Sequence, residues 1–118
     1  MTSELAISIQ HARGQSIGDM VRRSAQRTPG KMAITCGATV WSYAELDAIC
    51  NRLSRGLMAA GIAKGDRVAV LSRNSHAFAA LRFALARIGA VLVPINFMLN
   101  PDEIRFILAS SGATLLAV

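Results

Sequence analysis

The sequence contains few of the residue types that usually perform catalysis or hold metals. Among its 118 residues there are only two histidines and only two cysteines, Cys36 and Cys50. Two thiols with no second pair and no neighbouring histidine cannot form a four-ligand zinc site. Cys50 falls on the apolar side of a predicted helix, which indicates a packing role. The simplest interpretation of both thiols is a reduced, cytoplasmic setting.

The sequence also lacks a membrane-spanning run and a secretory signal. Its longest apolar stretch, Ile88–Leu99, is too short to cross a bilayer, and it contains Pro94. Residues 1–15 include the acidic Glu4 and have no sustained apolar run, so they do not look like a signal peptide. We interpret residues 1–15 as a loose N-terminal arm, and the protein as one that has no transmembrane segment.

Positive charge is in excess, but it is not gathered in one place. Thirteen basic residues against seven acidic ones give a formal net charge of +6, which could serve nucleic acid, an anionic membrane surface or a polyphosphate. The arginines are spread over three predicted helices: Arg22, Arg23 and Arg27, then Arg52 and Arg55, then Arg82 and Arg87. No basic run is interleaved with aromatic residues for stacking. Solvated helix faces are therefore favoured over a nucleic-acid surface.

What the sequence does contain is a high apolar content arranged in short runs. Apolar residues make up 53% of a chain long enough to bury one small core. Arg67–Leu71, Ala90–Ile95 and Thr114–Val118 read as continuous apolar strands rather than alternating ones. Strands of this kind are covered on both faces, which predicts a parallel sheet joined by right-handed helical crossovers. The expected fold class is α/β.

Capping signals place four helices around these strands. Three pairs of residues have the spacing of a capping box: Ser16 with Asp19, Ser42 with Glu45, and Asn100 with Glu103. Asn74 or Ser75 should cap the remaining helix, whose many alanines would allow it to lie close against the sheet. The first helix should end at Thr28-Pro29-Gly30, because proline disfavours helical geometry in the residue before it. Gly61 should end the second.

A hairpin and two apolar helix stripes complete the expected architecture. Met32–Cys36 and Thr39–Trp41 are β-prone runs separated by Gly37-Ala38, which predicts an antiparallel hairpin. The first helix carries a narrow apolar stripe of Ile17, Met20 and Val21 at helical spacing. The second helix carries a broader stripe: Leu46, Ile49, Cys50, Leu53 and Leu57.

Motifs for nucleotide binding and nucleophilic catalysis are not found. The turn after Leu71 contains no glycine that would let backbone N–H groups approach a phosphate. Gly56 and Gly61 have the spacing of two P-loop glycines, but Ile62 stands where a lysine is required. His76 is adjacent to Ser75 on a helix, and adjacent helical residues point in different directions. We therefore assign no catalytic, cofactor-binding or metal-binding residue.

We expect any ligand site at the carboxyl ends of the parallel strands. Ligands of open parallel sheets bind beyond these ends, which here are the turns Ser72-Arg73-Asn74 and Asn96-Phe97-Met98. If any residues contact a substrate, we expect them in these two turns; the alternative is that both are ordinary polar loops. Asp66 lies at the opposite end of its strand. The other acids near helix starts, Asp19, Glu45 and Glu103, are explained as capping groups.

A series of short segments gives a more specific indication than any single residue. In order they are Ile17–Met20, Arg27–Ile34, Trp41–Leu46, Gly61, Gly65–Ala69, Asn74-Ser75, Gly89–Asn96, and Glu103-Ile104 through Ile107-Leu108 to Ser111-Gly112-Ala113. Each segment is weak alone, but together the series resembles the acyl-CoA synthetase branch of the adenylate-forming, AMP-binding superfamily. The resemblance runs from Ile17 to Val118. It implies that residues 16–118 are the truncated N-terminal segment of an AMP-binding domain.

The resemblance implies a parent enzyme that joins a carboxylic acid to coenzyme A, using ATP and Mg²⁺ through an acyl-adenylate. The run from Pro94 to Leu99 is more similar to fatty- or aromatic-acid ligases than to peptide-synthetase adenylation domains. The phosphate loop, the nucleotide-binding motifs and the catalytic lysine of the family have no matching positions here. We therefore expect this stretch alone to be inactive, to bind none of these cofactors, and to self-associate through an uncovered sheet. The alternatives are a stand-alone α/β protein-interaction module and a peptide-synthetase-type fragment.

Overall fold

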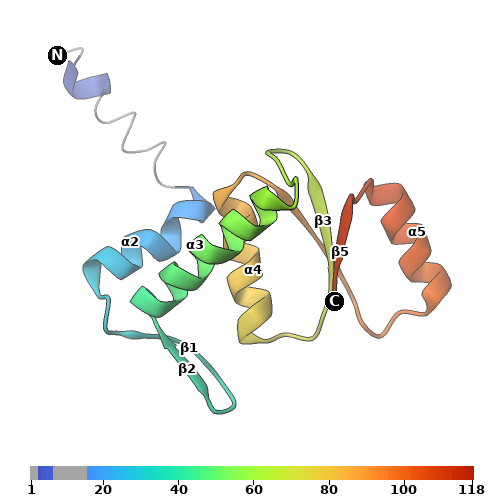
Figure 1. The fold of residues 1–118 in the computed structure, drawn as a ribbon, viewed down its shortest axis with the longest axis horizontal. Helices are drawn as coiled ribbons and strands as arrows, with labels where there is room; N and C mark the ends of the chain where they lie inside the picture. The colour runs from blue at the N-terminus through green and yellow to red at the C-terminus, as the bar shows by residue number, and fades with distance from the viewer. Residues whose placement is uncertain (1–2, 7–15) are drawn as a thin grey trace.

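The computed structural model describes residues 3–6 and 16–118, and it shows an α/β arrangement (Figure 1). Residues 3–6 form a helical turn, and the rest of the expected arm lies outside the described residues. The remaining elements are η1 (Ile17–Asp19), α2 (Met20–Arg27), β1 (Met32–Cys36), β2 (Thr39–Ser42), α3 (Tyr43–Ala59), β3 (Arg67–Leu71), α4 (His76–Arg87), β4 (Val91–Ile95), α5 (Pro101–Ser111) and β5 (Leu115–Ala117). Among these elements no helix is both long and apolar enough to cross a bilayer.

The three strands β3, β4 and β5 form the predicted parallel sheet, in the order β4-β3-β5. The chain moves from β3 outward to β4 and then returns past β3 to β5. When two crossovers of the same hand run in opposite directions along a sheet, their helices lie on opposite faces. Figure 1 shows α4 and α5 on opposite sides of the strands. The α/β prediction is confirmed.

Burial of the strands differs from the expectation that all three are covered on both faces. The central strand β3 is covered, since Val68, Ala69 and Val70 are at most 2% exposed. The flanking strands are not, since Leu115 and Leu116 of β5 are 38% and 39% exposed. The reason is topological: among the strands of the described residues, β3 alone has a neighbouring strand on each side in this sheet. The helix α5 approaches one face of the sheet, but none of its own residues is buried. A continuous apolar run therefore predicted the strand but not its burial.

The predicted hairpin is confirmed. β1 and β2 pair antiparallel, Cys36 lies opposite Thr39, and β2 extends one residue further than expected, to Ser42. Gly37 takes a φ of 58° in the connecting turn, a left-handed conformation that glycine adopts without a steric penalty.

Capping is confirmed at three helices and wrong at one. The side chains of Ser42, Ser75 and Asn100 each accept a hydrogen bond from the backbone N–H three residues on. Ser16 does not. Its hydroxyl donates instead to the Asp19 carboxylate at 2.9 Å, because the chain enters a 3₁₀ turn whose Asp19 N–H is already bonded to the Ser16 carbonyl. The Ser16 hydrogen bond is the main cause that lowers the pKa of Asp19.

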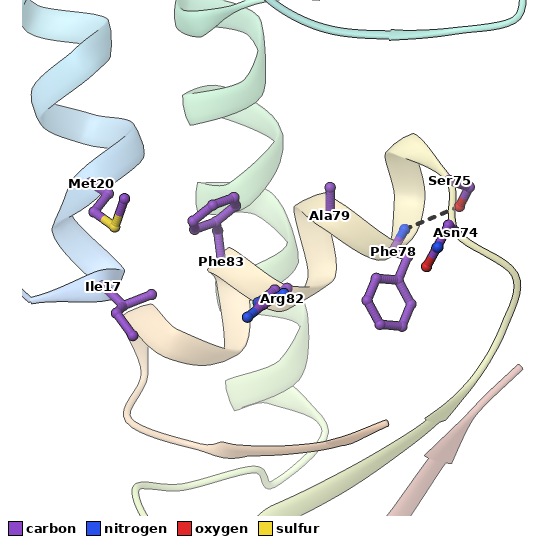
Figure 2. A pocket seen from close by; sticks show the side chains of 8 residues that line it. All are labelled: Ile17, Met20, Asn74, Ser75, Phe78, Ala79, Arg82 and Phe83. Atoms are coloured by element: carbon purple, nitrogen blue, oxygen red, sulfur yellow. Dashed lines mark hydrogen bonds between the residues drawn. The ribbon is translucent and has the colours of Figure 1, made fainter. Parts of the chain in front are cut away.

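The apolar stripe of the first helix is divided between the core and the surface. Val21 is 4% exposed and packs with α3 and α4, whereas Ile17 and Met20 are 62% and 54% exposed. Figure 2 shows Ile17 and Met20 beside α4, where they line a groove with a volume of about 470 Å³ together with Phe78, Arg82 and other α4 residues. The stripe therefore predicts correctly which side of the helix faces the rest of the protein, but it does not predict how deeply the residues of that side are buried.

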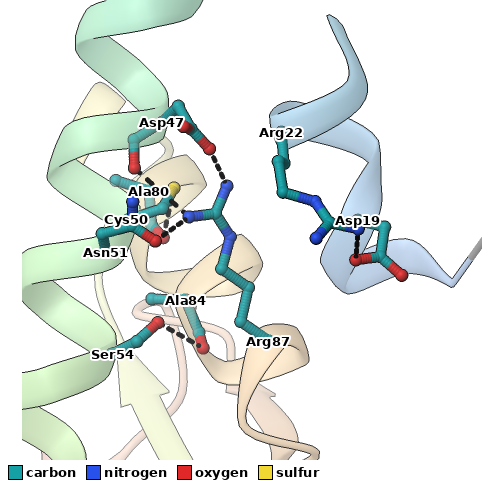
Figure 3. Close-up of polar contacts among 9 residues, drawn as sticks. All are labelled: Asp19, Arg22, Asp47, Cys50, Asn51, Ser54, Ala80, Ala84 and Arg87. Carbon is teal, nitrogen blue, oxygen red and sulfur yellow. Dashed lines mark hydrogen bonds and ion pairs between the residues drawn. The ribbon is translucent and has the colours of Figure 1, made fainter. Parts of the chain in front are cut away.

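The alanines of α4 pack against another helix rather than only against the sheet. Ala80 and Ala84 are fully buried beside α3, where the Cys50 thiol contacts the Ala80 carbonyl at 3.7 Å and the Ser54 hydroxyl donates to the Ala84 carbonyl at 3.2 Å (Figure 3). The sheet side of α4 is instead formed by larger residues, including Leu85. Small side chains lie where two helix backbones come closest, and large ones fill the wider gap to the sheet.

Arg87 contradicts the expectation that the arginines occupy solvated faces. Its guanidinium donates to the Asn51 side chain at 2.6 Å, to the Asp47 carbonyl at 3.2 Å, and to the Asp47 carboxylate (Figure 3). The Arg87 side chain is only 12% exposed. Sequence periodicity missed this because the acceptors lie 36 and 40 residues earlier in the chain.

The two thiols should differ sharply in reactivity. Burial is the main cause that raises the pKa of Cys50 above its ordinary value, and its side chain is inaccessible to solvent. Cys36 is a free thiol of intermediate exposure. Alkylating reagents attack the thiolate, so at mildly alkaline pH iodoacetamide should label Cys36 and leave Cys50 unlabelled until urea unfolds the chain. Both thiols lie in the tryptic peptide 32–52, so tandem mass spectrometry of that peptide over time checks which thiol is labelled, and equal labelling of both native thiols would contradict the prediction.

Candidate functional site

The two turns singled out at the carboxyl ends of β3 and β4 lie together in the structure. They line a cleft with a volume of about 380 Å³. Its residues are Ser72 and Asn74 after β3, Phe78 in α4, and Pro94, Ile95, Asn96 and Phe97 at the end of β4. The parallel register places Leu71 opposite Ile95, so both turns begin at the same level of the sheet. The two turns therefore meet at one end of the sheet, and their contact with a substrate stays a prediction.

Local hydrogen bonds hold each turn in place. After β3, the Ser72 hydroxyl donates to the Arg73 carbonyl at 3.0 Å, and the Ser75 hydroxyl accepts from the Phe78 N–H at 3.2 Å. After β4, the Asn96 side-chain oxygen accepts from the Met98 N–H at 2.9 Å, which closes an Asx turn. The Asn96 side-chain oxygen is therefore engaged, and its NH₂ group is the part that can donate to a ligand.

A cation–aromatic contact connects the two turns. The guanidinium carbon of Arg73 lies 5.0 Å from the centre of the Phe97 ring, within the range of a cation–π interaction. Among the described residues, no carboxylate lines the cleft. The cleft thus combines apolar side chains with amide and hydroxyl groups and one nearby positive charge. This arrangement can bind and orient a ligand, but it supplies no nucleophile or general base.

His76 and Asp66 do not join the cleft. The His76 ring meets the Trp41 ring edge-on, with centroids 4.8 Å apart, and its Nδ1 is buried without a hydrogen-bond partner in the part of the chain that is described. Its neighbour Ser75 caps α4 and is not paired with it. Asp66 lies before β3, where its carboxylate accepts from the Ala63 N–H at 2.8 Å. Its location at the other end of the strand is as predicted.

The larger groove beside α4 was not predicted from the sequence. It is lined by Ile17 and Met20 on one side and by α4 on the other, and it shares Asn74 and Phe78 with the cleft (Figure 2). The only signal in the sequence was the apolar stripe of the first helix, which also fits a fully packed helix. Within residues 3–6 and 16–118, no three His, Cys, Asp or Glu side chains come together to hold a metal ion.

Comparison with known proteins shows the family to which this chain belongs. The family model described as AMP-binding enzyme matches residues 21–118. Feruloyl-CoA synthase from Amycolatopsis is 43% identical over 104 residues, which cover 88% of this chain and 21% of that protein.

Two solved structures share the fold. A fatty acyl CoA synthetase from Mycobacterium tuberculosis superposes with a TM-score of 0.83 at 42% identity, covering 86% of this chain and 20% of that one. NpsA-ThdA, an artificially fused adenylation-PCP di-domain from Klebsiella oxytoca, superposes with a TM-score of 0.81 at 31% identity, covering 86% and 19%. The chain spans about a fifth of the length of these relatives. It belongs to the family of AMP-binding enzymes, and it corresponds to the N-terminal part of the acyl-CoA synthetases in that family.

Proposed function

We propose that this chain is the N-terminal portion of a cytoplasmic ligase that joins a fatty or aromatic acid to coenzyme A. In the proposed reaction the carboxylate of the acid attacks the α-phosphorus of ATP and releases pyrophosphate, which leaves an acyl-adenylate. The thiol of coenzyme A then attacks the acyl carbon and releases AMP, which leaves the thioester. The catalytic power would come from electrostatic stabilisation of the phosphoryl and acyl oxyanions.

One observation carries this proposal: relatives named for acyl-CoA synthesis match nearly the whole chain at more than 40% identity. One is named for feruloyl-CoA, an aromatic thioester, and one for fatty acyl-CoA. These two names support an aromatic or a fatty acid as the substrate class.

Within the proposed enzyme, we assign this chain a binding and scaffolding role. The cleft between the two strand-end turns lies where ligands of parallel sheets bind, and it is lined by Asn96 and by the apolar side chains of Pro94, Phe78 and Phe97. In our proposal a flat or aliphatic group contacts these apolar side chains while its polar part meets the Asn96 amide. The backbone of β3 and the helix α4 hold the two turns at a fixed separation.

The described residues do not fit ATP or Mg²⁺ by themselves. The turn after β3 has no glycine to bring backbone N–H groups near a triphosphate, and the part of the chain that the structure describes places no carboxylate in the cleft that could ligate Mg²⁺. In our proposal the residues of this chain therefore carry out no chemical step. In our proposal, ATP, Mg²⁺ and coenzyme A are held by parts of the enzyme that lie outside residues 1–118.

A second candidate is an adenylation unit of a peptide synthetase. The 31% identity and TM-score of 0.81 with NpsA-ThdA favour it. The two candidates share the first half-reaction and differ in the acceptor, which is coenzyme A for the ligase and a carrier-protein thiol for the synthetase. The remaining alternative, a non-catalytic interaction module, would show neither half-reaction.

The proposed function is tested on a polypeptide extended past Val118 to the length of the relatives. Ferulate, palmitate and an amino acid are each supplied with ATP, Mg²⁺ and coenzyme A, and the thioester is detected by mass spectrometry. Formation of feruloyl- or palmitoyl-CoA is the expected result. Adenylation of the amino acid without any acyl-CoA would favour the peptide-synthetase candidate, and no adenylate with any acid would overturn both.

Purified residues 1–118 should be inactive in the same assays. We expect no acid-dependent exchange of radiolabelled pyrophosphate into ATP, and no heat of ATP binding in titration calorimetry, because the cleft has no group that holds a triphosphate. The extended polypeptide, assayed in parallel, is the positive control. Exchange above background by residues 1–118 that depends on an added acid would show that the triphosphate site lies within this chain.

A further inference from the structure

A separate cleft lies at the other end of the sheet, where β3 and β4 begin. It has a volume of about 490 Å³ and lies between the second half of α3, the turn before β3 and the end of α4. We call it the basic cleft, because among the described residues its lining includes three cations and no carboxylate. Its polar residues are Asn51, Ser54 and Arg55 of α3, Lys64 of the turn, and Arg87 of α4.

Two of the three positive charges in the basic cleft have no carboxylate partner. Arg87 is paired with a carboxylate of α3. Arg55 and Lys64 form no ion pair with any residue in the part of the chain that is described. The nearest acid in the sequence to Lys64 is Asp66, whose carboxylate accepts from the Ala63 N–H at 2.8 Å and is not part of the lining. The basic cleft therefore presents an excess of positive charge to whatever occupies it.

Contacts with neighbouring groups position two of the donors in the basic cleft. The stem of Lys64 lies against Gly89, since a Cβ added to Gly89 would be 2.9 Å from the Lys64 Cγ. The Gly65 N–H donates to the Gly89 carbonyl at 2.9 Å, which joins the turn to the chain after α4. The Asn51 side-chain oxygen accepts from Arg87 at 2.6 Å. Its NH₂ group is therefore the part of Asn51 that is left to donate to a ligand.

The charges restrict what can cover the basic cleft. An apolar surface would bury Arg55 and Lys64 without a partner, which is strongly unfavourable, so water or an anion must occupy the space. A helix C-terminus favours a nearby cation, and this accounts for Arg87 in the last turn of α4. It does not account for Arg55, which precedes the last turn of α3, or for Lys64, which lies outside both helices.

We propose that the basic cleft binds a phosphate monoester. Such a group carries a charge of about −1.5 to −2 at neutral pH, which matches the two unpaired cations, whereas a carboxylate carries a single charge. Its oxygens can accept from Arg55, Lys64 and the Asn51 NH₂ group together, and the apolar lining, which includes Met58 and Ile88, contacts the organic group of the ester. ATP is not a ligand when Mg²⁺ is present, because Mg²⁺ neutralises its β- and γ-oxygens. The proposal is independent of the ligase function.

Titration calorimetry at constant ionic strength tests the proposal on the 118-residue chain and on the extended polypeptide. The probes are phenyl phosphate, inorganic phosphate and acetate. We expect both phosphates to bind, the phenyl ester more tightly, and acetate to give no saturable heat. Arg55→Gln and Lys64→Gln should each weaken phosphate binding by about tenfold to a hundredfold, the effect of losing one charge-assisted hydrogen bond.

Arg52→Gln is the matched control. Arg52 is exposed on the same helix and does not line the basic cleft, and its removal changes the net charge by the same amount. It should leave the affinity unchanged. An equal loss in Arg52→Gln would overturn the proposal, because net charge alone would then attract the anion. Phosphate binding that survives the double variant Arg55→Gln with Lys64→Gln would overturn it as well.

Nuclear magnetic resonance of the parent chain provides a readout that needs no variant. Phenyl phosphate should shift the amide signals of Lys64 and Gly89 and leave that of Asn96, at the other end of the sheet, unchanged. Absence of binding to the 118-residue chain would overturn the proposal. So would binding that is lost in the extended polypeptide, since another part of the enzyme would then occupy the basic cleft. Binding of inorganic phosphate without the phenyl ester would overturn the assignment to an ester.

Discussion

Gly18→Ala should be one of the most destabilising small substitutions in this chain, lowering the free energy of unfolding by about 2–3 kcal/mol. Gly18 is buried in η1, and a Cβ placed on it would lie 2.9 Å from both the Ala86 carbonyl oxygen and the Arg87 Cα. Both are backbone atoms at the end of α4, so neither can move aside by changing a rotamer. The added methyl group must push η1 away from α4. Urea denaturation of dilute protein followed by circular dichroism measures the loss.

Gly56→Ala is the matched control and should change stability in the opposite direction. Gly56 lies within α3 and is exposed, and a Cβ added to it would meet no neighbouring atom within 4 Å. Alanine there should stabilise the chain by about 0.5–1 kcal/mol, because glycine loses more backbone entropy in a helix. Equal effects of the two substitutions would show that η1 does not approach α4 as closely as the structure describes.

Arg87→Met should lower the free energy of unfolding by about 2–3 kcal/mol, somewhat less than the roughly 3–5 kcal/mol that removal of one partner of a buried ion pair usually costs. We expect the smaller effect because Asp47 remains 24% exposed and can recover some hydration. The substitution also leaves the Asn51 side chain and the Asp47 carbonyl without the donor that connects α3 to α4. The same urea titration measures this change.

Two controls separate the ion pair from a general effect of losing an arginine. Arg22→Met removes the Arg22–Asp19 pair, whose arginine is 53% exposed, and should change stability by no more than about 0.5 kcal/mol. The double variant Asp47→Leu with Arg87→Met should be more stable than Arg87→Met alone, because no uncompensated carboxylate remains. If Arg22→Met were as costly as Arg87→Met, burial would not be the cause of the difference.

Most of the element order was predictable from local patterns. The hairpin and three of the four caps depend on interactions within a few residues, such as the hydrogen bond from the Glu45 N–H to the Ser42 hydroxyl. The parallel strands were visible as short apolar runs, although their pairing joins distant residues such as Arg67 and Val91. The Ser16 cap was wrong because the same Ser-x-x-Asp spacing fits a 3₁₀ turn, in which the hydroxyl donates to the carboxylate instead.

The candidate site was predictable in position but not in shape. Knowing that the strands are parallel was enough to bring the turns after Leu71 and Ile95 to one end of the sheet. The contact between Arg73 and Phe97, and the groove that Ile17 and Met20 add beside the cleft, required the structure. Both features join segments that are far apart in the sequence. Patterns among neighbouring residues do not predict contacts between such segments.

The sequence by itself determined the α/β class, the order of the elements and the family resemblance, because hydrophobic periodicity, capping and turn chemistry act between near neighbours. Tertiary structure alone decided that Arg87 is held between two helices, that Ala80 and Ala84 face α3, and that Val68 and Val70 are buried while Leu115 and Leu116 are more than a third exposed. Burial is a property of what packs against a residue, and the packing partners come from distant parts of the chain. Runs with the same apolar composition therefore became a covered central strand in β3 and an exposed edge strand in β5.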